Sequence, residues 1–204
     1  MSFSDPIRRR SSSATNSARL GKGLAATVGS LLLALSGLAV GTQPAGAYTL
    51  EGLKWHGTQD SGCCAHINVK YRGFSYGGNQ TAIDDAISAW NGSPANVLLC
   101  ANCAGNLTAG DENNSADGWY GLTSWSTSSS WGSHYFGNVT LTLNWSGMSG
   151  LSSSGRKEVA MHELGHAMGL GHTSGCIGVM EGSSTICGYT TPQSDDVNGI
   201  NSLY

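Results

Sequence analysis

The spacing of apolar residues along the chain predicts a mixed α and β fold. Residues 67–71, Ile-Asn-Val-Lys-Tyr, alternate between apolar and polar positions, which is typical of a strand with one buried face. In residues 81–90 the apolar positions recur every three or four residues. Asn91-Gly92 and then Pro94 follow as a stop. We therefore predict an amphipathic helix over 81–90.

Shorter apolar runs predict further strands on either side of polar segments. The strand candidates are 97–100, 119–125 and 139–144. Residues 105–118 are rich in Asn, Asp and Gly, and we expect a loop there. The Ser-rich tract 124–133 is likewise expected to be a surface loop. No internal repeat or long linker interrupts this pattern, so we expect one domain.

A helix is also predicted over residues 159–168, because this stretch lacks Pro and is rich in strong helix formers. Three serines at 152–154 precede it as candidate N-caps. Gly169 and Gly171 follow, and both can adopt the positive φ that ends a helix. The resulting turn should bring His172 back toward the helix.

The histidines of this segment have the spacing of a metal site. His162 and His166 lie four positions apart, so their imidazoles share one helix face. Together with His172 they would form a tris-histidine zinc site with an open fourth position for water, as a catalytic zinc requires. Glu163 would accept a proton from the zinc-bound water and later deliver it to the leaving amine. The alternative is a helix with surface histidines, in which case this spacing would be a coincidence.

The beginning of the chain has the pattern of an export signal. Half of the ten basic residues lie in the first 22 positions, ahead of an apolar run over 24–40 and small residues at 44–47. We predict cleavage after Ala47, which makes 1–47 a signal peptide and 48–204 one secreted, extracellular domain. A membrane anchor is the alternative, but a run of about 17 residues containing Gly and Ser is short for a bilayer span of about 20.

The charge of the predicted mature part excludes one class of function. Residues 48–204 carry five basic and twelve acidic side chains, a formal net charge of −7, and the basic ones do not cluster. A nucleic-acid-binding role is therefore not expected. We expect a monomer without membrane contact after signal cleavage.

All six cysteines fall in the predicted mature part, and an even number in an exported chain favours disulfides. The favoured pairing joins Cys63 and Cys64 to Cys100 and Cys103, in either order, and leaves Cys176 and Cys187 to close a short loop. Four thiolates at 63, 64, 100 and 103 around a structural zinc are the alternative. Adjacent cysteines are poorly spaced for such a tetrahedral site.

The pattern His-Glu-x-x-His-x-x-Gly-x-x-His resembles the metzincin clan of zinc endopeptidases. Three other segments resemble the matrixin family within that clan, namely 48–55 at its start, 86–90 at the end of its first helix and 195–204 in its last helix. The resemblance implies an α+β fold with a twisted five-stranded, mostly parallel sheet and one antiparallel edge strand. Two long helices and a small C-terminal subdomain with a third helix would complete it.

The resemblance also implies roles for single residues. His162, His166 and His172 would bind one catalytic zinc, Glu163 would be the general base, and Met180 would be the Met-turn residue beneath the ligands. Protein or peptide substrates would lie extended along the edge strand, for which we expect 120–124.

The resemblance is incomplete in two places. Glu181 and Gly182 follow Met180 where matrixins usually carry Tyr-Pro, so a pocket preference does not transfer. Calcium is conceivable but unsupported, because Asp111, Glu112 and Asp117 are only loose candidates and a solvated loop is the preferred interpretation.

These patterns favour a secreted zinc-dependent endopeptidase that uses a Glu-activated, zinc-bound water. One alternative is a secreted carbohydrate- or surface-binding module, since six Trp and seven Tyr lie among Ser- and Gly-rich segments. Another is a narrow-specificity zinc peptidase that acts on cell-wall peptides.

Overall fold

The computed structural model describes residues 2–3, 48–57, 64–182 and 186–204. Most of the predicted signal peptide, residues 1–47, lies outside the described residues. The strands are β1 (Ser2–Phe3), β2 (Thr49–Leu50), β3 (Ala65–Tyr71), β4 (Val97–Ala101), β5 (Leu107–Glu112), β6 (Gly121–Ser128), β7 (Gly132–Asn144) and β8 (Leu170–Gly171). The helices are α1 (Gly77–Asn91), α2 (Trp145–Met148), α3 (Ser153–Met168) and α4 (Ser194–Leu203). None of the helices in this part of the chain is long and apolar enough to cross a membrane.

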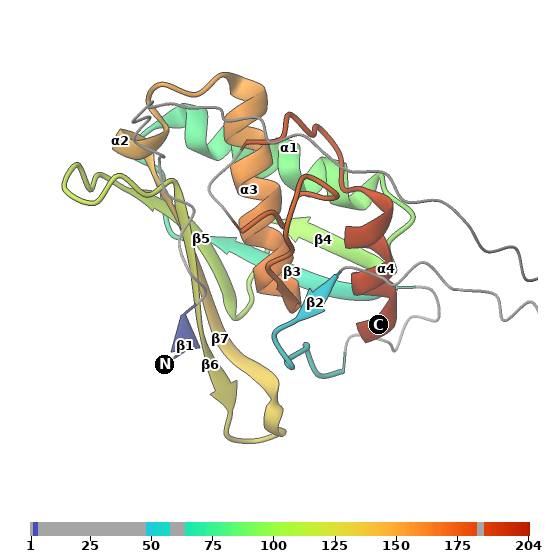
Figure 1. Ribbon diagram of the computed structural model, residues 1–204. Coiled ribbons are helices and arrows are strands. Elements are labelled where there is room, and N and C mark those ends of the chain that lie inside the picture. Colours follow the sequence, from blue (N-terminus) through green and yellow to red (C-terminus); the bar gives the residue numbers. More distant parts are fainter. Residues whose placement is uncertain (1, 4–47, 58–63, 183–185) are drawn as a thin grey trace, which may run out of the picture. The chain divides into compact units, whose positions relative to one another are not determined.

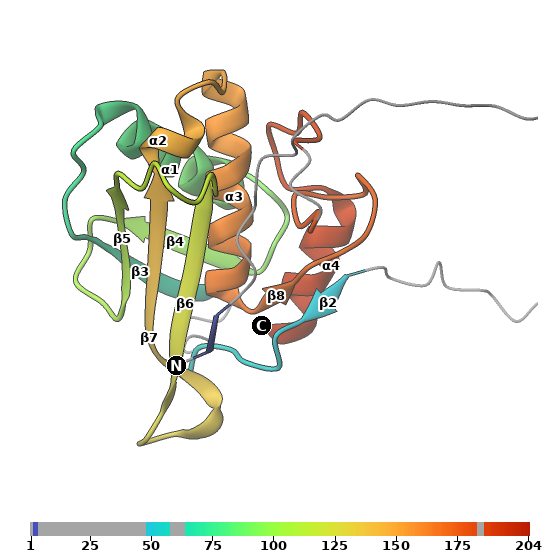
Figure 2. The same ribbon diagram turned by 60° about the vertical axis from the view of Figure 1, so that its left-hand side comes forward.

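The main sheet has the strand order β1-β6-β7-β5-β3-β4 (Figure 2). Strands β4, β3, β5 and β7 are parallel, whereas β6 runs antiparallel to β7. Apart from the two-residue β1, the sheet has five strands, four of them parallel and β6 antiparallel at the side, which confirms the prediction. Strand β6 contains most of the expected edge segment 120–124. The two residues of β1 pair antiparallel with the outer side of β6.

Two long helices cover one face of this sheet (Figure 1). Helix α1 packs against β4 and β5, helix α3 packs against β6 and β7, and the two helices pack against each other. In β3 the side chains of Ala65, Ile67 and Val69 are buried while the alternating residues are exposed, so only one sheet face is covered. The buried Trp90 of α1 donates its indole N–H to the carbonyl of Met161 in α3, at 3.1 Å.

The predicted loop over 105–118 is partly wrong, because β5 occupies 107–112 in the middle of the sheet. Leu107 and Ala109 are fully buried between β3 and β7. Asp111 is one of the polar residues that made this segment resemble a loop, and its side chain has a structural role. Asp111 accepts hydrogen bonds from the backbone N–H groups of Ser75 and Tyr76, just before α1, at 2.7 and 3.0 Å.

Helix α1 and strands β6 and β7 extend beyond the bounds predicted from the sequence. Helix α1 ends near the predicted stop but begins at Gly77, four residues before the apolar pattern starts. Most of the Ser-rich tract 124–133 is paired β-structure, since β6 continues to Ser128 and β7 begins at Gly132. Polar residues are tolerated there because they belong to a two-stranded hairpin with exposed side chains.

The disulfide pattern agrees with the prediction at one pair and contradicts it at the other. Cys176 and Cys187 are bonded, as expected. Cys100 is bonded to Cys103 rather than to Cys63 or Cys64, which also excludes the four-thiolate zinc site. Asn102 adopts a positive φ of 54° between the two cysteines, and this turn brings their Cα atoms to 5.7 Å. Cys63 lies outside the described residues.

Candidate active site

Helix α3 places two of the candidate ligands on one buried face. It begins after Ser152, whose hydroxyl accepts the backbone N–H of Gly155 at 3.1 Å. It ends at Gly169, which has a φ of 108° and lies directly against the backbone carbonyl of Leu53. A side chain at residue 169 would therefore be both strained and obstructed, which explains why this helix ends on glycine.

The chain after Gly169 carries His172 back to the helix. Strand β8 pairs antiparallel with β2, which fixes this turn against the segment that starts the domain. The hydroxyl of Thr49 in β2 donates a hydrogen bond to the carbonyl of His172 at 2.5 Å. A short two-stranded ladder thus holds the third histidine in place.

The three histidines converge through the same ring atom. The Nε2 atoms of His162 and His166 are 3.0 Å apart, and each lies 3.0–3.1 Å from Nε2 of His172. His162 and His166 are buried and His172 is half-buried. Among the described residues, these three form the single group of three or more His, Cys, Asp or Glu side chains close enough to share a metal ion.

The opposite ring nitrogens show that this cluster fits a metal. Nδ1 of His162 lies 2.7 Å from the carbonyl of Val179, and Nδ1 of His166 lies 2.8 Å from the carbonyl of Leu170. A carbonyl only accepts, so both Nδ1 atoms carry the proton and both Nε2 lone pairs point into the cluster. Zn–N bonds of about 2.0–2.1 Å at tetrahedral angles place ligand nitrogens about 3.3 Å apart, close to the spacing seen here.

The environment keeps His162 neutral. Burial, with the neighbouring His166 and His172 as secondary causes, lowers the pKa of His162 well below its usual value. The carbonyl of Val179 opposes this shift. A neutral imidazole is the form that binds a metal, so the site favours the ligand state.

Glu163 is buried beside the cluster and is held by one side chain of the antiparallel strand. The hydroxyl of Thr123 in β6 lies 2.7 Å from Oε2 of Glu163 and 3.0 Å from its backbone carbonyl. No donor within the described part of the chain reaches the other carboxylate oxygen, Oε1. Burial raises the pKa of Glu163 to about 8, and the Thr123 hydrogen bond opposes that rise.

The free oxygen of Glu163 lies against the edge strand. Gly121, the first residue of β6, leaves the room for it, because a Cβ at this glycine would lie 2.6 Å from Oε1. An extended segment along β6 would therefore pass beside a buried carboxylate oxygen that has an unused acceptor position.

Met180 packs under the two helical histidines. It is 1% exposed, and its Sδ lies directly against Gly165, which immediately precedes His166 in α3. A Cβ at Gly165 would collide with this sulfur. The structure therefore places Met180 where the Met-turn prediction expects it, and its role stays a prediction.

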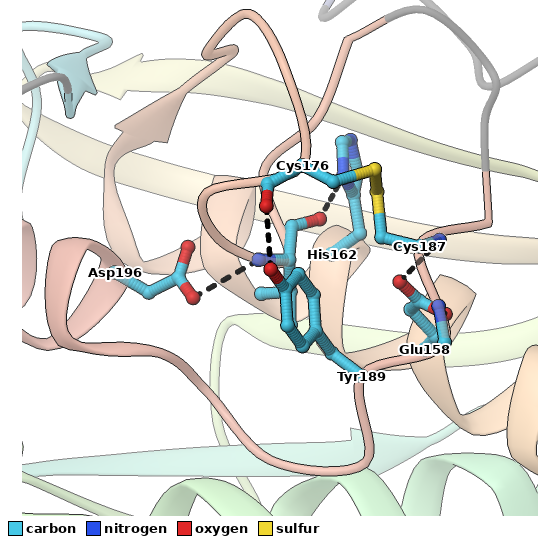
Figure 3. The surroundings of a disulfide bond; sticks show 8 residues. Glu158, His162, Cys176, Cys187, Tyr189 and Asp196 are labelled. Atoms are coloured by element: carbon cyan, nitrogen blue, oxygen red, sulfur yellow. Dashed lines mark hydrogen bonds between the residues drawn. A yellow bond between two sulfur atoms is a disulfide. The ribbon is translucent and has the colours of Figure 1, made fainter.

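The segment around Met180 is fixed by two buried carboxylates (Figure 3). Asp196 accepts the backbone N–H of Val179 at 3.0 Å, and Val179 in turn binds His162 through its carbonyl. Glu158 accepts the N–H groups of Cys187 and Gly188, both at 2.8 Å. Burial is the main cause that raises the pKa of each of these carboxyl groups.

The disulfide closes the same segment (Figure 3). Cys176 and Cys187 flank Met180, and the hydroxyl of Tyr189 donates to the carbonyl of Cys176. Glu181, which follows Met180, is buried at 6% exposure. The C-terminal segment is thus anchored at several points around the third ligand and the methionine.

The sequence analysis did not identify Thr123, Glu158 and Asp196 as residues that support the site through hydrogen bonds. Thr123 was part of a strand candidate and Asp196 was part of the segment 195–204, but neither was given a role, and Glu158 belonged to no motif. Thr123 binds the carboxylate of Glu163, whereas Glu158 and Asp196 bind backbone N–H groups. These partners are far away in the sequence and become neighbours only when the chain folds. Neither Glu158 nor Asp196 stands out in the sequence, because both helices contain several other polar or charged residues.

The calcium candidates do not gather into a site among the described residues. Asp111 is used at the start of α1, as described above. Asp117 accepts a hydrogen bond from the side chain of Asn114 at 3.1 Å, and Glu112 is exposed.

Comparison with known proteins gives one family match. The sequence model of the matrixin family matches residues 124–204, which include the three histidines, Glu163 and Met180. No curated protein matches the chain. A similar solved structure is high choriolytic enzyme 1, a hatching enzyme zinc-protease from the medaka fish Oryzias latipes, with 18% identity and a TM-score of 0.39. That alignment covers 60% of this chain and 51% of the other, so this chain spans about half of the hatching enzyme's length. The predicted matrixin resemblance is thereby confirmed over residues 124–204.

Proposed function

We propose that this matrixin-like chain is a secreted zinc endopeptidase that hydrolyses peptide bonds in extended protein segments. His162, His166 and His172 would hold the metal and Glu163 would be the general base. The observation that carries the proposal is the convergence of three Nε2 atoms within 3.0–3.1 Å, beside a buried carboxylate. The matrixin match over 124–204 supports the same assignment.

The chemistry divides between the metal and the chain's own groups. When bound, zinc supplies a Lewis acid and lowers the pKa of a coordinated water. A bound zinc cation would favour the ionised form of Glu163 against the burial that raises its pKa to about 8. In that form Glu163 removes a proton from the water that attacks the scissile carbonyl carbon. It returns that proton to the amine nitrogen as the carbon–nitrogen bond breaks. Thr123 holds Oε2, so Oε1 is the oxygen that carries the proton.

The outer side of β6 is the proposed place for the substrate. The first residue of this strand, Gly121, borders Oε1 of Glu163. Strand β1 pairs antiparallel with Ser124 and Trp125, which supports an edge that accepts an extended segment through main-chain hydrogen bonds. A substrate bound in the same way closer to Gly121 would present its peptide group to Glu163.

Secretion and the domain boundary belong to the same proposal. The basic, then apolar, then small-residue pattern of 1–47 supports an export signal, with 48–204 as the catalytic domain. The bonds Cys100–Cys103 and Cys176–Cys187 support an oxidising compartment.

Hydrolysis of casein by the purified protein tests the proposal. We expect cleavage that a chelator abolishes and added zinc restores, with about one zinc per chain by elemental analysis. Glu163→Gln should keep the zinc and lose cleavage, whereas Glu112→Gln, at an exposed position, should keep both. Casein cleavage that survives Glu163→Gln would overturn the mechanism. A zinc-loaded protein that does not cleave casein would point to the narrow-specificity alternative.

A further inference from the structure

A polar groove lies at the tip of the β6–β7 hairpin, and none of the candidate active-site residues lines it. It has a volume of about 310 Å³. A second hollow of about 270 Å³ adjoins it over the beginnings of β3 and β5. The two share Trp55, His56 and Asn106, so they are neighbouring hollows.

An exposed tryptophan forms one wall of this groove. Trp131 is 59% exposed, the highest value among the large hydrophobic residues in the described part of the chain. Its ring stacks on His56 with centroids 3.9 Å apart and planes 9° apart. Tyr135 meets His56 edge-on at 5.0 Å, and the backbone N–H of Trp131 donates to the hydroxyl of Ser128 at 3.0 Å, which anchors the turn that carries the indole. The indole is therefore held in a fixed orientation although much of its surface faces water.

The rest of the lining is polar but carries no carboxylate, lysine or arginine. Besides the aromatic rings and histidines it consists mainly of amides and hydroxyls, from Asn68, Asn106, Thr127, Ser128, Ser129, Ser130 and Asn138. No hydrogen bond among the described residues uses the side-chain amide of Asn106 or Asn138, and both residues are exposed. These amides can donate and accept toward a ligand.

This combination selects a class of ligand. A phosphate or carboxylate ligand would lack a cationic partner here. An extended peptide would find the outer edge of β7 in this hairpin already occupied, because the backbone of Lys54 exchanges hydrogen bonds with His134 and Phe136. A pyranose ring presents an apolar C–H face, which suits an indole, and a rim of hydroxyls, which suits amides and serines.

We propose that this groove binds a neutral glycan chain, with Trp131 as the stacking platform and Asn106 and Asn138 as hydrogen-bonding partners. Two neighbouring hollows that share a wall suit several linked sugars rather than one. Such a site would hold the protein on a polysaccharide or on the glycan of a glycoprotein. It does not depend on the proposed hydrolysis, because its residues are separate from the histidine cluster.

Binding assays on the full chain test this site. The protein is produced in a host that does not N-glycosylate, since Asn106 and Asn138 begin Asn-x-Thr sequons. Retention is measured on insoluble chitin, cellulose and xylan. A second arm compares ribonuclease B, which carries a neutral mannose glycan, with unglycosylated ribonuclease A. The first arm reports binding to a polysaccharide and the second reports binding to a protein-linked glycan.

Trp131→Ala should weaken retention at least tenfold on whichever glycan binds, and Asn138→Ala should weaken it to a smaller degree. Tyr76→Ala is the matched control, since Tyr76 is an exposed aromatic residue outside the groove. All three variants should keep wild-type thermal unfolding, and their casein hydrolysis should equal that of the wild type. Absence of retention on every glycan, or retention that Trp131→Ala leaves unchanged, would overturn the proposal.

Discussion

Replacing Thr123 with valine should impair the proposed general base without disturbing the metal ligands. Valine has nearly the shape of threonine, and Thr123 is fully buried, so the change mainly removes the hydroxyl. That hydroxyl is 2.7 Å from Oε2 of Glu163. In the variant, the carboxylate would have no donor from β6 at either oxygen, and its side chain would lose the contact that orients it.

The size of the effect follows from the strength of this hydrogen bond. A hydrogen bond to a charged group contributes roughly 1.5–3 kcal/mol, and about 1.4 kcal/mol corresponds to a factor of ten. We therefore expect kcat/KM for a fluorogenic peptide to fall about 10- to 100-fold at neutral pH. Most of the fall should be in kcat, because Thr123 orients a group that acts in the chemical step. Zinc content should remain at one per chain.

Two variants separate this effect from a general loss of stability. Thr123→Ser keeps the hydroxyl and should recover most of the activity. Thr142→Val removes a buried hydroxyl on the neighbouring strand that accepts a hydrogen bond from Arg72, so it should lower the unfolding temperature and leave kcat/KM close to wild type. A Thr123→Val protein with full zinc content and kcat/KM within twofold of wild type would refute the role given to Thr123.

Three further substitutions test the support of the histidine cluster. Gly165→Ala should cost about 1–3 kcal/mol of unfolding free energy, because its methyl group would overlap the Met180 sulfur, and an unchanged urea midpoint would contradict that packing. Cys176→Ser should lower the unfolding free energy by about 2–3 kcal/mol and reduce turnover, whereas unchanged melting and turnover would show that the disulfide with Cys187 does not support the site. Burial raises the folded-state pKa of Glu158 above its unfolded value, so folding favours the protonated carboxyl group. This contribution to the stability is fully present below the unfolded pKa and is lost as pH rises through the folded pKa. The stability of the wild type relative to Glu158→Gln in urea unfolding should therefore decrease as pH rises from the unfolded pKa of Glu158 through its raised folded pKa, and a pH-independent difference would refute the assigned burial cost.

The features that were predictable from sequence are those set by local spacing. The four-position spacing of His162 and His166 fixes a shared helix face, and a glycine at 169 marks the helix end. Each of these depends on a few neighbouring residues. The turn after Gly169 likewise predicted that His172 returns to the helix, and the structure brings it to His162 and His166. Only the antiparallel edge position of residues 120–124 came from the matrixin resemblance, and β6 (Gly121–Ser128) contains most of them.

The features that were missed depend on partners distant in sequence. Strand β5 has few strongly apolar residues, and it is a strand because β3 and β7 pair with it on both sides. The expected link between the cysteines at 63–64 and those at 100–103 failed because a single positive-φ residue, Asn102, closes Cys100 onto Cys103. Conformations of this kind are set by the surrounding turn, which composition does not reveal.

The orientation of the first histidine shows how much of the site lies outside its motif. Nδ1 of His162 is fixed by the carbonyl of Val179, and the N–H of Val179 is fixed by Asp196. The same Asp196 oxygen accepts the N–H of Gln193 at 2.7 Å, which caps helix α4. One buried carboxylate therefore couples the start of the last helix to the ring that must direct its lone pair at the metal. Since backbone groups make both contacts, no residue type at 179 could have revealed them, and the C-terminal helix belongs to the histidine site as much as α3 does.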